Sequence, residues 1–339
     1  MTQRREGDSR FGLVLGGGGL VGMAYHAGVL QALHERGVDV TGADVIVGTS
    51  AGSIIGAYLA SGWAQTDFYE YAHRRHPNAA KDPDDMEQQV REIFEPLWST
   101  PQERVRRYIG SAFALASSRG HLHRLTKGKP PIQSLRKGFP SGMYSTERTR
   151  QRLHEELPPE WPHEGLRVCT VDLYSGERVV FGAKSAPEAH LADAVLASTA
   201  IPGVFPAVSI DGKRYVDGGA YSATSLDVAV KEGCDRILCV APLGYRNEGA
   251  AIDPKVWLPI ITRSLFARSL RREVNDARSK GVEVLVIRPS IEDLPHMGSN
   301  AMRSFDRKGL TERARRSALK ALVDLEGHPV LETTRTTSR

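Results

Sequence analysis

The chain has 339 residues, 40% of them hydrophobic and 25% charged, which is enough for one large core or for a core with an added cap. Its formal net charge of +5 is too small to indicate nucleic-acid binding, and no nucleic-acid reader motif accompanies it. We therefore expect a globular protein that does not bind nucleic acid.

The cysteines and the first ten residues indicate the compartment. Residues 1–10 contain no apolar stretch, so the sequence predicts no secretory signal. Cys169, Cys234 and Cys239 are odd in number and lie in or beside apolar runs, which is typical of buried thiols in a reducing cytoplasm. Because the sequence has neither a Cys-x-x-Cys pair nor a His-Glu-x-x-His motif, we expect a cytoplasmic protein without a metal or a cofactor.

The first predicted strand, Phe11–Leu15, runs into a loop of residues 16–22 that contains five glycines, and then into a helix. Consecutive glycines let several backbone N–H groups turn toward one point, which is what an oxyanion hole requires. The glycine loop is therefore a candidate for stabilising a developing negative charge.

The same loop also fits a dinucleotide-binding fingerprint, with Gly17, Gly19 and Gly22 as its GxGxxG. That alternative requires an acidic residue at the end of a second strand, about 20 residues further on. Asp39 lies in a short connection and Asp44 begins a strand, so neither fits the position well. The glycines alone favour a nucleotide, but the next motif does not.

The second predicted strand, Asp44–Thr49, is followed by Ser50 and a helical segment. Gly48 and Gly52 flank the serine in a GxSxG pattern, and they allow the sharp turn of a nucleophile elbow. The Ser50 hydroxyl then lies at the carboxyl edge of a sheet and at the positive end of a helix. Residues 45–63 are mostly apolar, but an elbow in their middle argues against a membrane-spanning helix.

Residues 64–157 lack strand patterns and are rich in charge, so we expect a helical cap inserted beside the site. Helices are predicted after Thr66, Asp84, Gln102 and Ser145. Residues 101–138 combine many Lys and Arg side chains with apolar ones, as a surface that contacts anionic membrane does. A solvated basic helix face explains the same pattern equally well.

Strands and helices alternate in the rest of the chain. Further strands are predicted at Leu166–Asp172, Arg178–Phe181, Arg214–Asp217, Arg236–Ala241 and Val282–Ile287. Helices are predicted after Glu188 and Ser222, near Val256–Ala277 and near Thr311–Leu325. This alternation predicts an α/β fold with a central, mainly parallel sheet covered on both faces, spanning residues 11–325, with disordered tails at 1–10 and 326–339.

The strand that ends at Asp217 is followed by Gly218 and Gly219. Asp-Gly-Gly is most often an ordinary turn. However, a carboxylate at a strand end with small neighbours is also what a nucleophilic serine needs when an aspartate is its direct base.

The glycine loop, the Gly-Thr-Ser-Ala-Gly elbow and the Asp-Gly-Gly motif, in this order, resemble the three signatures of the patatin-like phospholipase family. Residues 197–206 and 298–302 resemble further segments of its bacterial members. The resemblance implies a three-layer α/β/α catalytic domain and lipid acyl-ester hydrolysis. It also implies a catalytic dyad of Ser50 and Asp217, with an oxyanion hole made by the N–H groups of Gly17, Gly18 and Gly19.

Two departures from the family pattern affect the loops. Val21 stands where the family often has Arg or Lys, and residues 223–225 are Ala-Thr-Ser where many relatives have Asn and Pro. The backbone donors do not depend on either side chain, so we expect the oxyanion hole to survive. These departures affect how the loop after Asp217 (residues 218–225, the Asp loop) is braced and which head group is preferred.

Three histidines are candidates for the base of an alternative Ser-His-Asp triad. His296 and His328 follow Asp217 in the chain and are expected to be solvated loop residues, and His26 is expected to pack or cap near the glycine loop. Two other functions stay open from the residues alone: a binding module for a lipid or a partner that does not turn it over, and a dinucleotide-binding protein. Acyl transfer to an alcohol would use the same residues as hydrolysis.

Overall fold

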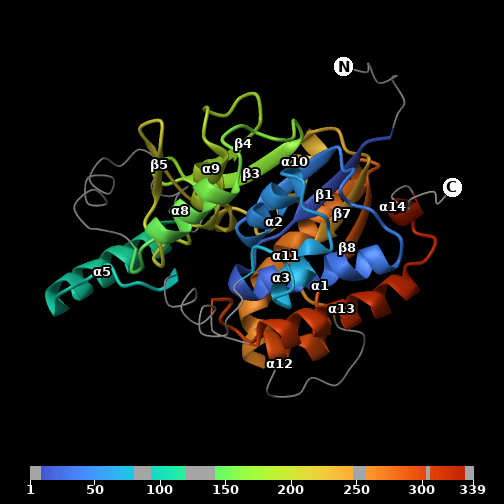
Figure 1. Cartoon of the computed structure of the whole chain (residues 1–339). Helices are drawn as coiled ribbons and strands as arrows, with labels where there is room; N and C mark the ends of the chain where they lie inside the picture. The colour runs from blue at the N-terminus through green and yellow to red at the C-terminus, as the bar shows by residue number, and fades with distance from the viewer. Residues whose placement is uncertain (1–8, 80–92, 119–141, 247–256, 303–305, 333–339) are drawn as a thin grey trace.

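The computed structural model describes residues 9–79, 93–118, 142–246, 257–302 and 306–332. Their eight-stranded sheet has the order β5-β6-β3-β2-β1-β7-β8, with β4 paired to β3 (Figure 1). The strands are β1 (Phe11–Leu15), β2 (Val45–Thr49), β3 (Leu166–Asp172), β4 (Arg178–Phe181), β5 (Val208–Ile210), β6 (Lys213–Asp217), β7 (Arg236–Val240) and β8 (Glu283–Ile287).

The sheet is mixed but mainly parallel, as the sequence predicts. β3, β2, β1, β7 and β8 form one continuous parallel set with β1 at its centre. β4, β5 and β6 join by antiparallel pairing. The fully buried runs of the central strands are typical of parallel strands covered on both faces.

Helices cover both faces of the sheet. The main helices are α1 (Gly19–Glu35), α2 (Ala51–Ala60), α3 (Asp67–Ala72), α5 (Pro101–Ser118), α8 (Glu147–Glu156), α9 (Leu191–Thr199), α10 (Leu226–Lys231), α11 (Trp257–Ser279), α12 (Leu294–Met297), α13 (Arg307–Asp324) and α14 (Pro329–Glu332). Leu13 and Leu15 of β1 pack with α1, α2, α9 and α13, and Val14 packs on the opposite face with α10 and α11. The alternation of side chains along β1 thus separates two hydrophobic layers.

The described residues of the expected cap form helices joined by turns, with one isolated bridge between Pro96 and Tyr144. α3, α5 and α8 lie between residues 64 and 157, and α5 extends away from the sheet (Figure 1). The helix predicted after Asp84 and most of the basic segment beyond residue 118 lie outside the described residues.

Two expectations need correction. The segment from residue 326 was expected to be a disordered tail, but residues 329–332 form α14, whose Val330 and Leu331 are buried in the core. The structure also contains a strand that the sequence does not predict, β5, which has only three residues and pairs with β6. A run this short is below the length at which strand periodicity can be recognised.

Candidate active site

Ser50 lies at a strained turn between β2 and α2. Its backbone angles are φ 53° and ψ −123°, in a region that non-glycine residues rarely adopt and that costs about 1–3 kcal/mol. A Cβ at Gly48 would approach the Ser53 Cα to 2.5 Å, and one at Gly52 would overlap the Leu15 carbonyl. Both flanking glycines are therefore required sterically, as expected for a nucleophile elbow.

The backbone of this elbow is held by a residue that the sequence does not single out. The Ser50 N–H donates to the Ser198 hydroxyl at 2.9 Å, and that hydroxyl donates to the Cys169 carbonyl at 2.7 Å. Ser198 lies at the end of α9 and is fully buried. The sequence feature that could have indicated Ser198 is its place in the segment at residues 197–206, which resembles bacterial members of the family.

Asp217 reaches Ser50 because two strands end at the same point of β3. Thr49, the last residue of β2, pairs with Cys169, and Asp217, the last residue of β6, pairs with the next residue, Thr170. β2 and β6 flank β3 on its two sides, β2 parallel and β6 antiparallel to it, so their carboxyl ends reach the same level of β3 from opposite directions. Ser50 and Asp217 are thereby brought side by side.

The Asp217 carboxylate is buried and has two partners. It accepts a hydrogen bond from the Gly219 N–H at 2.7 Å and one from the Ser50 hydroxyl. Burial raises the pKa of Asp217 to about 6, against the lowering effect of these two hydrogen bonds. A carboxylate with this pKa is a stronger base than a solvated aspartate and is still ionised at neutral pH.

The glycine loop lies against the elbow, with Gly17 next to the Ser50 side chain. The Gly17 N–H donates to the Ala223 carbonyl at 2.8 Å, so the expectation that Gly17 is an oxyanion donor needs correction. Gly18 and Gly19 precede or begin α1, and within the described part of the chain their N–H groups have no acceptor. Of the three glycines predicted as oxyanion donors, Gly18 and Gly19 are thus the two whose N–H groups are not used by an acceptor among the described residues.

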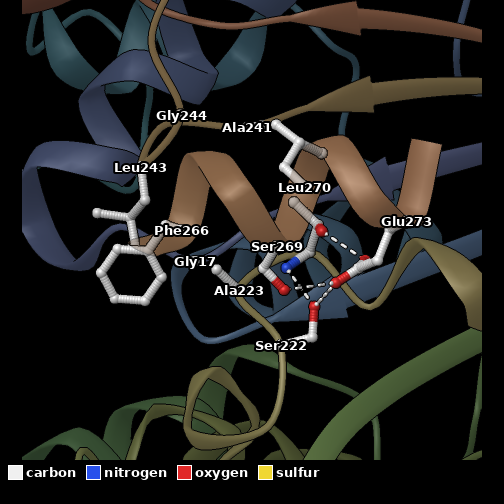
Figure 2. Close-up of a pocket in the computed structure, with 11 residues that line it drawn as sticks. Gly17, Ser222, Ala223, Ala241, Leu243, Gly244, Phe266, Ser269, Leu270 and Glu273 are labelled. Atoms are coloured by element: carbon white, nitrogen blue, oxygen red, sulfur yellow. Dashed lines mark hydrogen bonds between the residues drawn. The ribbon is translucent and has the colours of Figure 1, made fainter. Parts of the chain in front are cut away.

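The Asp loop is tied to both the glycine loop and α11. Glu273 of α11 accepts hydrogen bonds from the Ser222 hydroxyl at 2.5 Å, the Thr224 hydroxyl at 2.9 Å and the Leu226 N–H at 3.0 Å. Figure 2 shows Glu273 reaching toward Ser222 while Gly17 lies beside Ala223. The loop that lacks the family's Asn and Pro is thus braced by an acidic side chain from a neighbouring helix.

Val21, the other departure, is buried in the core, and its N–H donates to the Ala301 carbonyl at 3.1 Å. Met302 lies close to Gly19 on the same side. Residues 298–302 therefore support the glycine loop through backbone contact, which requires no cationic side chain at position 21.

The histidines do not join the Ser50 and Asp217 pair in the described structure. His26 is fully buried, and its Nε2 donates to the Gly16 carbonyl at 2.7 Å. Burial lowers the pKa of His26 to about 4, so the ring is neutral and acts as a support of the glycine loop. His296 is exposed, and the groups that act on Asp217 are Ser50 and Gly219 alone.

The acidic residues offered for a dinucleotide site are engaged elsewhere. Asp44 accepts from the Phe11 N–H at 2.8 Å, and Asp39 accepts from the Thr41 N–H at 2.9 Å within its own turn. β2 ends at Thr49 and leads into Ser50 rather than into an acidic residue. The arrangement therefore lacks the ribose-binding carboxylate that this fingerprint needs.

A cavity of about 580 Å³ opens beside Ser50. α1 and α2 form two of its walls, and segments of the cap and of the 196–205 region close it. The apolar side chains that line it are Leu20, Met23, Ala24, Ala27, Ala51, Ile54, Ile55, Trp63, Phe68, Ala72, Ile93, Leu153, Leu196, Ile201, Phe205 and Met302. A cavity of this composition suits a hydrocarbon chain attached to a carbonyl at Ser50.

Within the described residues, no group of His, Cys, Asp and Glu has the arrangement of a metal site. The described helices also include none that is long and apolar enough to cross a membrane.

The site and fold define a serine hydrolase-like centre on an α/β sheet, and the sequence comparison assigns its family. The family model described as patatin-like phospholipase matches residues 13–230, which include the glycine loop, the elbow and the Asp-Gly-Gly motif. This chain belongs to the patatin-like phospholipase family. Membership of this family suggests lipid acyl hydrolase activity.

Several curated relatives are distant or cover little of the chain. An uncharacterized NTE family protein of Mycobacterium tuberculosis is 26% identical over 284 residues, covering 81% of this chain and 61% of the relative. The chain thus spans about three fifths of that relative's length. The lysophospholipase nte1 of Aspergillus fumigatus is 59% identical over 49 residues, only 14% of this chain and 3% of that protein.

Among solved structures, VipD from Legionella pneumophila is 17% identical, with a TM-score of 0.43 over 94% of this chain and 67% of that one. The effector ExoU is 19% identical, with a TM-score of 0.36 over 93% of this chain and 53% of that one.

Proposed function

We propose that this chain is a carboxylic-ester hydrolase that acts on lipid acyl esters through Ser50 and Asp217. The observation that carries the proposal is the hydrogen bond from the Ser50 hydroxyl to the buried Asp217 carboxylate, at a strained elbow beside an apolar cavity. A hydroxyl, a raised-pKa base and two free backbone donors are the three parts that acyl transfer requires.

The reaction follows from this geometry. Asp217 takes the proton of Ser50 as its Oγ attacks the ester carbonyl, and the carbonyl oxygen becomes an oxyanion bound by the N–H groups of Gly18 and Gly19. Collapse of the tetrahedral intermediate breaks the ester bond, and Asp217 returns the proton to the leaving alcohol. Water then attacks the acyl-enzyme with Asp217 again as base, which releases the acid and restores Ser50.

Turnover of p-nitrophenyl esters by the purified protein tests this proposal. We expect Ser50→Ala and Asp217→Asn each to lower kcat/KM by roughly 10³-fold or more, because members of a catalytic unit fail together. His296→Ala is the matched control and should retain activity, since His296 is exposed. Retained activity in Asp217→Asn, with loss in His296→Ala, would contradict the dyad and indicate a histidine base.

We also propose that α5 contacts anionic membrane. Val105, Tyr108 and Ile109 are 58%, 68% and 50% exposed, and they lie among exposed arginines, including Arg104 and Arg106. Exposed apolar side chains flanked by cations are the pattern of interfacial helices. Each cation near an anionic surface contributes about 1 kcal/mol to binding.

Co-sedimentation with vesicles that contain anionic lipid tests this contact. We expect binding that weakens with added salt and that falls when Arg104 and Arg106 are both changed to Glu. Lys213→Glu, an exposed charge reversal on β6, serves as the control and should bind like the wild type. Binding that depends on neither salt nor these arginines would overturn the proposal.

A further inference from the structure

The cavity beside Ser50 is lined by apolar side chains of α1 and α2 and by mostly polar and charged side chains of α8, together with Arg307 of α13. α2 lines it with Ala51, Ile54, Ile55 and Tyr58, which share one face of the helix. At the rise of an α-helix, Tyr58 lies about 10 Å further along the axis than Ala51. A chain attached at Ser50 that follows α2 therefore reaches the level of Tyr58.

Tyr58 begins a connected polar cluster at this far end. Its hydroxyl hydrogen-bonds Glu156 of α8, and Arg152 donates from Nε to the same carboxylate at 2.7 Å. Arg152 also donates from Nη2 to the Tyr71 hydroxyl at 2.7 Å. All four residues line the cavity.

Arg307, the first residue of α13, also lies next to Tyr71. Its guanidinium carbon lies 5.9 Å from the Tyr71 ring centroid, and that of Arg152 lies 5.8 Å from it. Tyr71 therefore has two cations close to its ring, and Arg307 also lines the cavity.

Arg152 and Arg307 differ in their partners among the described residues. Glu156 is the carboxylate paired with Arg152. Beside Arg307 lie the neutral Tyr71 and two other arginines, Arg152 and Arg74, and within the described residues no ion pair joins Arg307 to a carboxylate. Burial lowers the pKa of Arg307, and the neighbouring Arg152 and Arg74 lower it further. Arg307 is half-buried, and a partly desolvated guanidinium beside other cations is stabilised when a bound group supplies an anion.

We propose that this cluster binds an anionic oxygen group at the far end of the substrate's acyl chain, so that the preferred substrates are esters of ω-carboxylated acyl chains. The apolar wall next to Ser50 excludes a polar leaving group from this direction and suits methylene groups instead. A planar guanidinium binds a carboxylate by two parallel hydrogen bonds, which suits Arg307 to this ligand. The inference rests on the proposed function, because it places the scissile carbonyl at Ser50.

The anionic group takes no part in bond breaking. Water and the ester give the dicarboxylic acid and the alcohol through the same acyl-enzyme, and the terminal carboxylate keeps its charge throughout. Its contribution is to binding and to the position of the chain.

Binding of octanedioate and octanoate, measured by calorimetry on the full chain and on Ser50→Ala, tests the subsite without requiring turnover. The two ligands share the carboxylate that would lie at Ser50 and differ only at the far end. We expect octanedioate to bind at least about tenfold more tightly to both proteins. Equal dissociation constants for the two ligands in the wild type would overturn the proposal.

Two substitutions on the first turn of α13 form a matched pair. Arg307→Met should remove the preference for octanedioate, whereas Lys308→Met, which removes an exposed charge next to it, should keep the preference. Arg307→Lys keeps the charge without the planar fork and should give an intermediate preference. A preference unchanged in folded Arg307→Met, as judged by circular dichroism, would also overturn the subsite.

Turnover of p-nitrophenyl octanoate and of mono-p-nitrophenyl octanedioate distinguishes a failure of this inference from a failure of the proposed hydrolase function on which it rests. Ser50-dependent turnover with at least about tenfold higher kcat/KM for the octanedioate ester supports both. Ser50-dependent turnover without that preference removes the anionic subsite and leaves the hydrolase. Preferential binding of octanedioate without Ser50-dependent turnover of either ester retains the anion site but removes the hydrolase, and with it the acyl-chain assignment.

Discussion

In the proposed reaction two residues carry the chemistry, and each is held in a state that its type does not favour in isolation. Ser50 has a positive φ that the flanking glycines and the Ser198 hydroxyl maintain. Asp217 is buried, which raises its pKa to about 6, well above the usual range of an aspartate. The sequence raises the problem that an aspartate is a weak base, and burial at the end of β6 gives the physical solution.

The pH dependence of activity follows from this pKa. Because Asp217 must be ionised to accept the Ser50 proton, we expect kcat/KM to rise with pH through about 6 and then to level off. The profile is measured with a neutral p-nitrophenyl ester between pH 4.5 and about 8. A rise centred near pH 4 would mean that Asp217 is not desolvated as it is here.

The same carboxylate affects stability in the opposite sense. The folded state binds its proton more tightly than the unfolded state, so the stabilisation present below about pH 4 is lost as pH rises through about 6. A shift of about two pKa units corresponds to roughly 3 kcal/mol. Asp217→Asn should therefore raise the melting temperature relative to wild type more at pH 8 than at pH 4, and equal changes at both would contradict this account.

At the scale of elements, the site depends on contacts between loops that are distant in sequence. Glu273 of α11 braces the Asp loop, and the Ala223 carbonyl of that loop accepts from the Gly17 N–H of the glycine loop. A change in α11 is thereby connected with the position of the oxyanion donors. The sequence indicates that bracing should differ here from the family pattern, but it does not identify the residue on α11.

Substitution at Glu273 tests this connection. We expect Glu273→Ala to lower kcat by about tenfold with little change in KM, because the loop loses acceptors for two hydroxyls and one N–H. Glu273→Gln keeps one acceptor oxygen and should restore part of kcat. Asp276→Ala, on the same helix but paired only with the exposed Lys280, should behave like the wild type. Unchanged kcat in folded Glu273→Ala would contradict the connection.

The elements themselves were largely predictable. The long apolar strands and the helices that follow Gly22 and Ser50 have strong periodicity and clear glycine signals, and their predicted bounds agree with the structure to within a few residues. β5 and α14 were not found, because each has only three or four residues and owes its place to tertiary contacts. Ser198 was missed because a serine at a helix end has no local feature that distinguishes it from a cap.

At the scale of the whole molecule, the register of the sheet determines that Ser50 and Asp217 lie close together, which no local sequence pattern shows. The motifs identify Ser50 and Asp217, but 167 positions separate them, and only the pairing of β2 and β6 with successive residues of β3 brings them together. Register depends on the packing of the complete sheet and not on any local pattern. The cavity likewise arises from α1, α2, α8 and α13, whose arrangement no single segment encodes.

The most direct test of the central claim is the mapping of covalent labelling by a fluorophosphonate probe, with intact-mass analysis of the wild type beside Ser50→Ala and Asp217→Asn. The account predicts one added probe on the wild type, on the peptide that contains Ser50, no labelling of Ser50→Ala and much slower labelling of Asp217→Asn. Labelling of Ser50→Ala at the wild-type rate, or of another residue in the wild type, would contradict the assignment of Ser50 as the nucleophile.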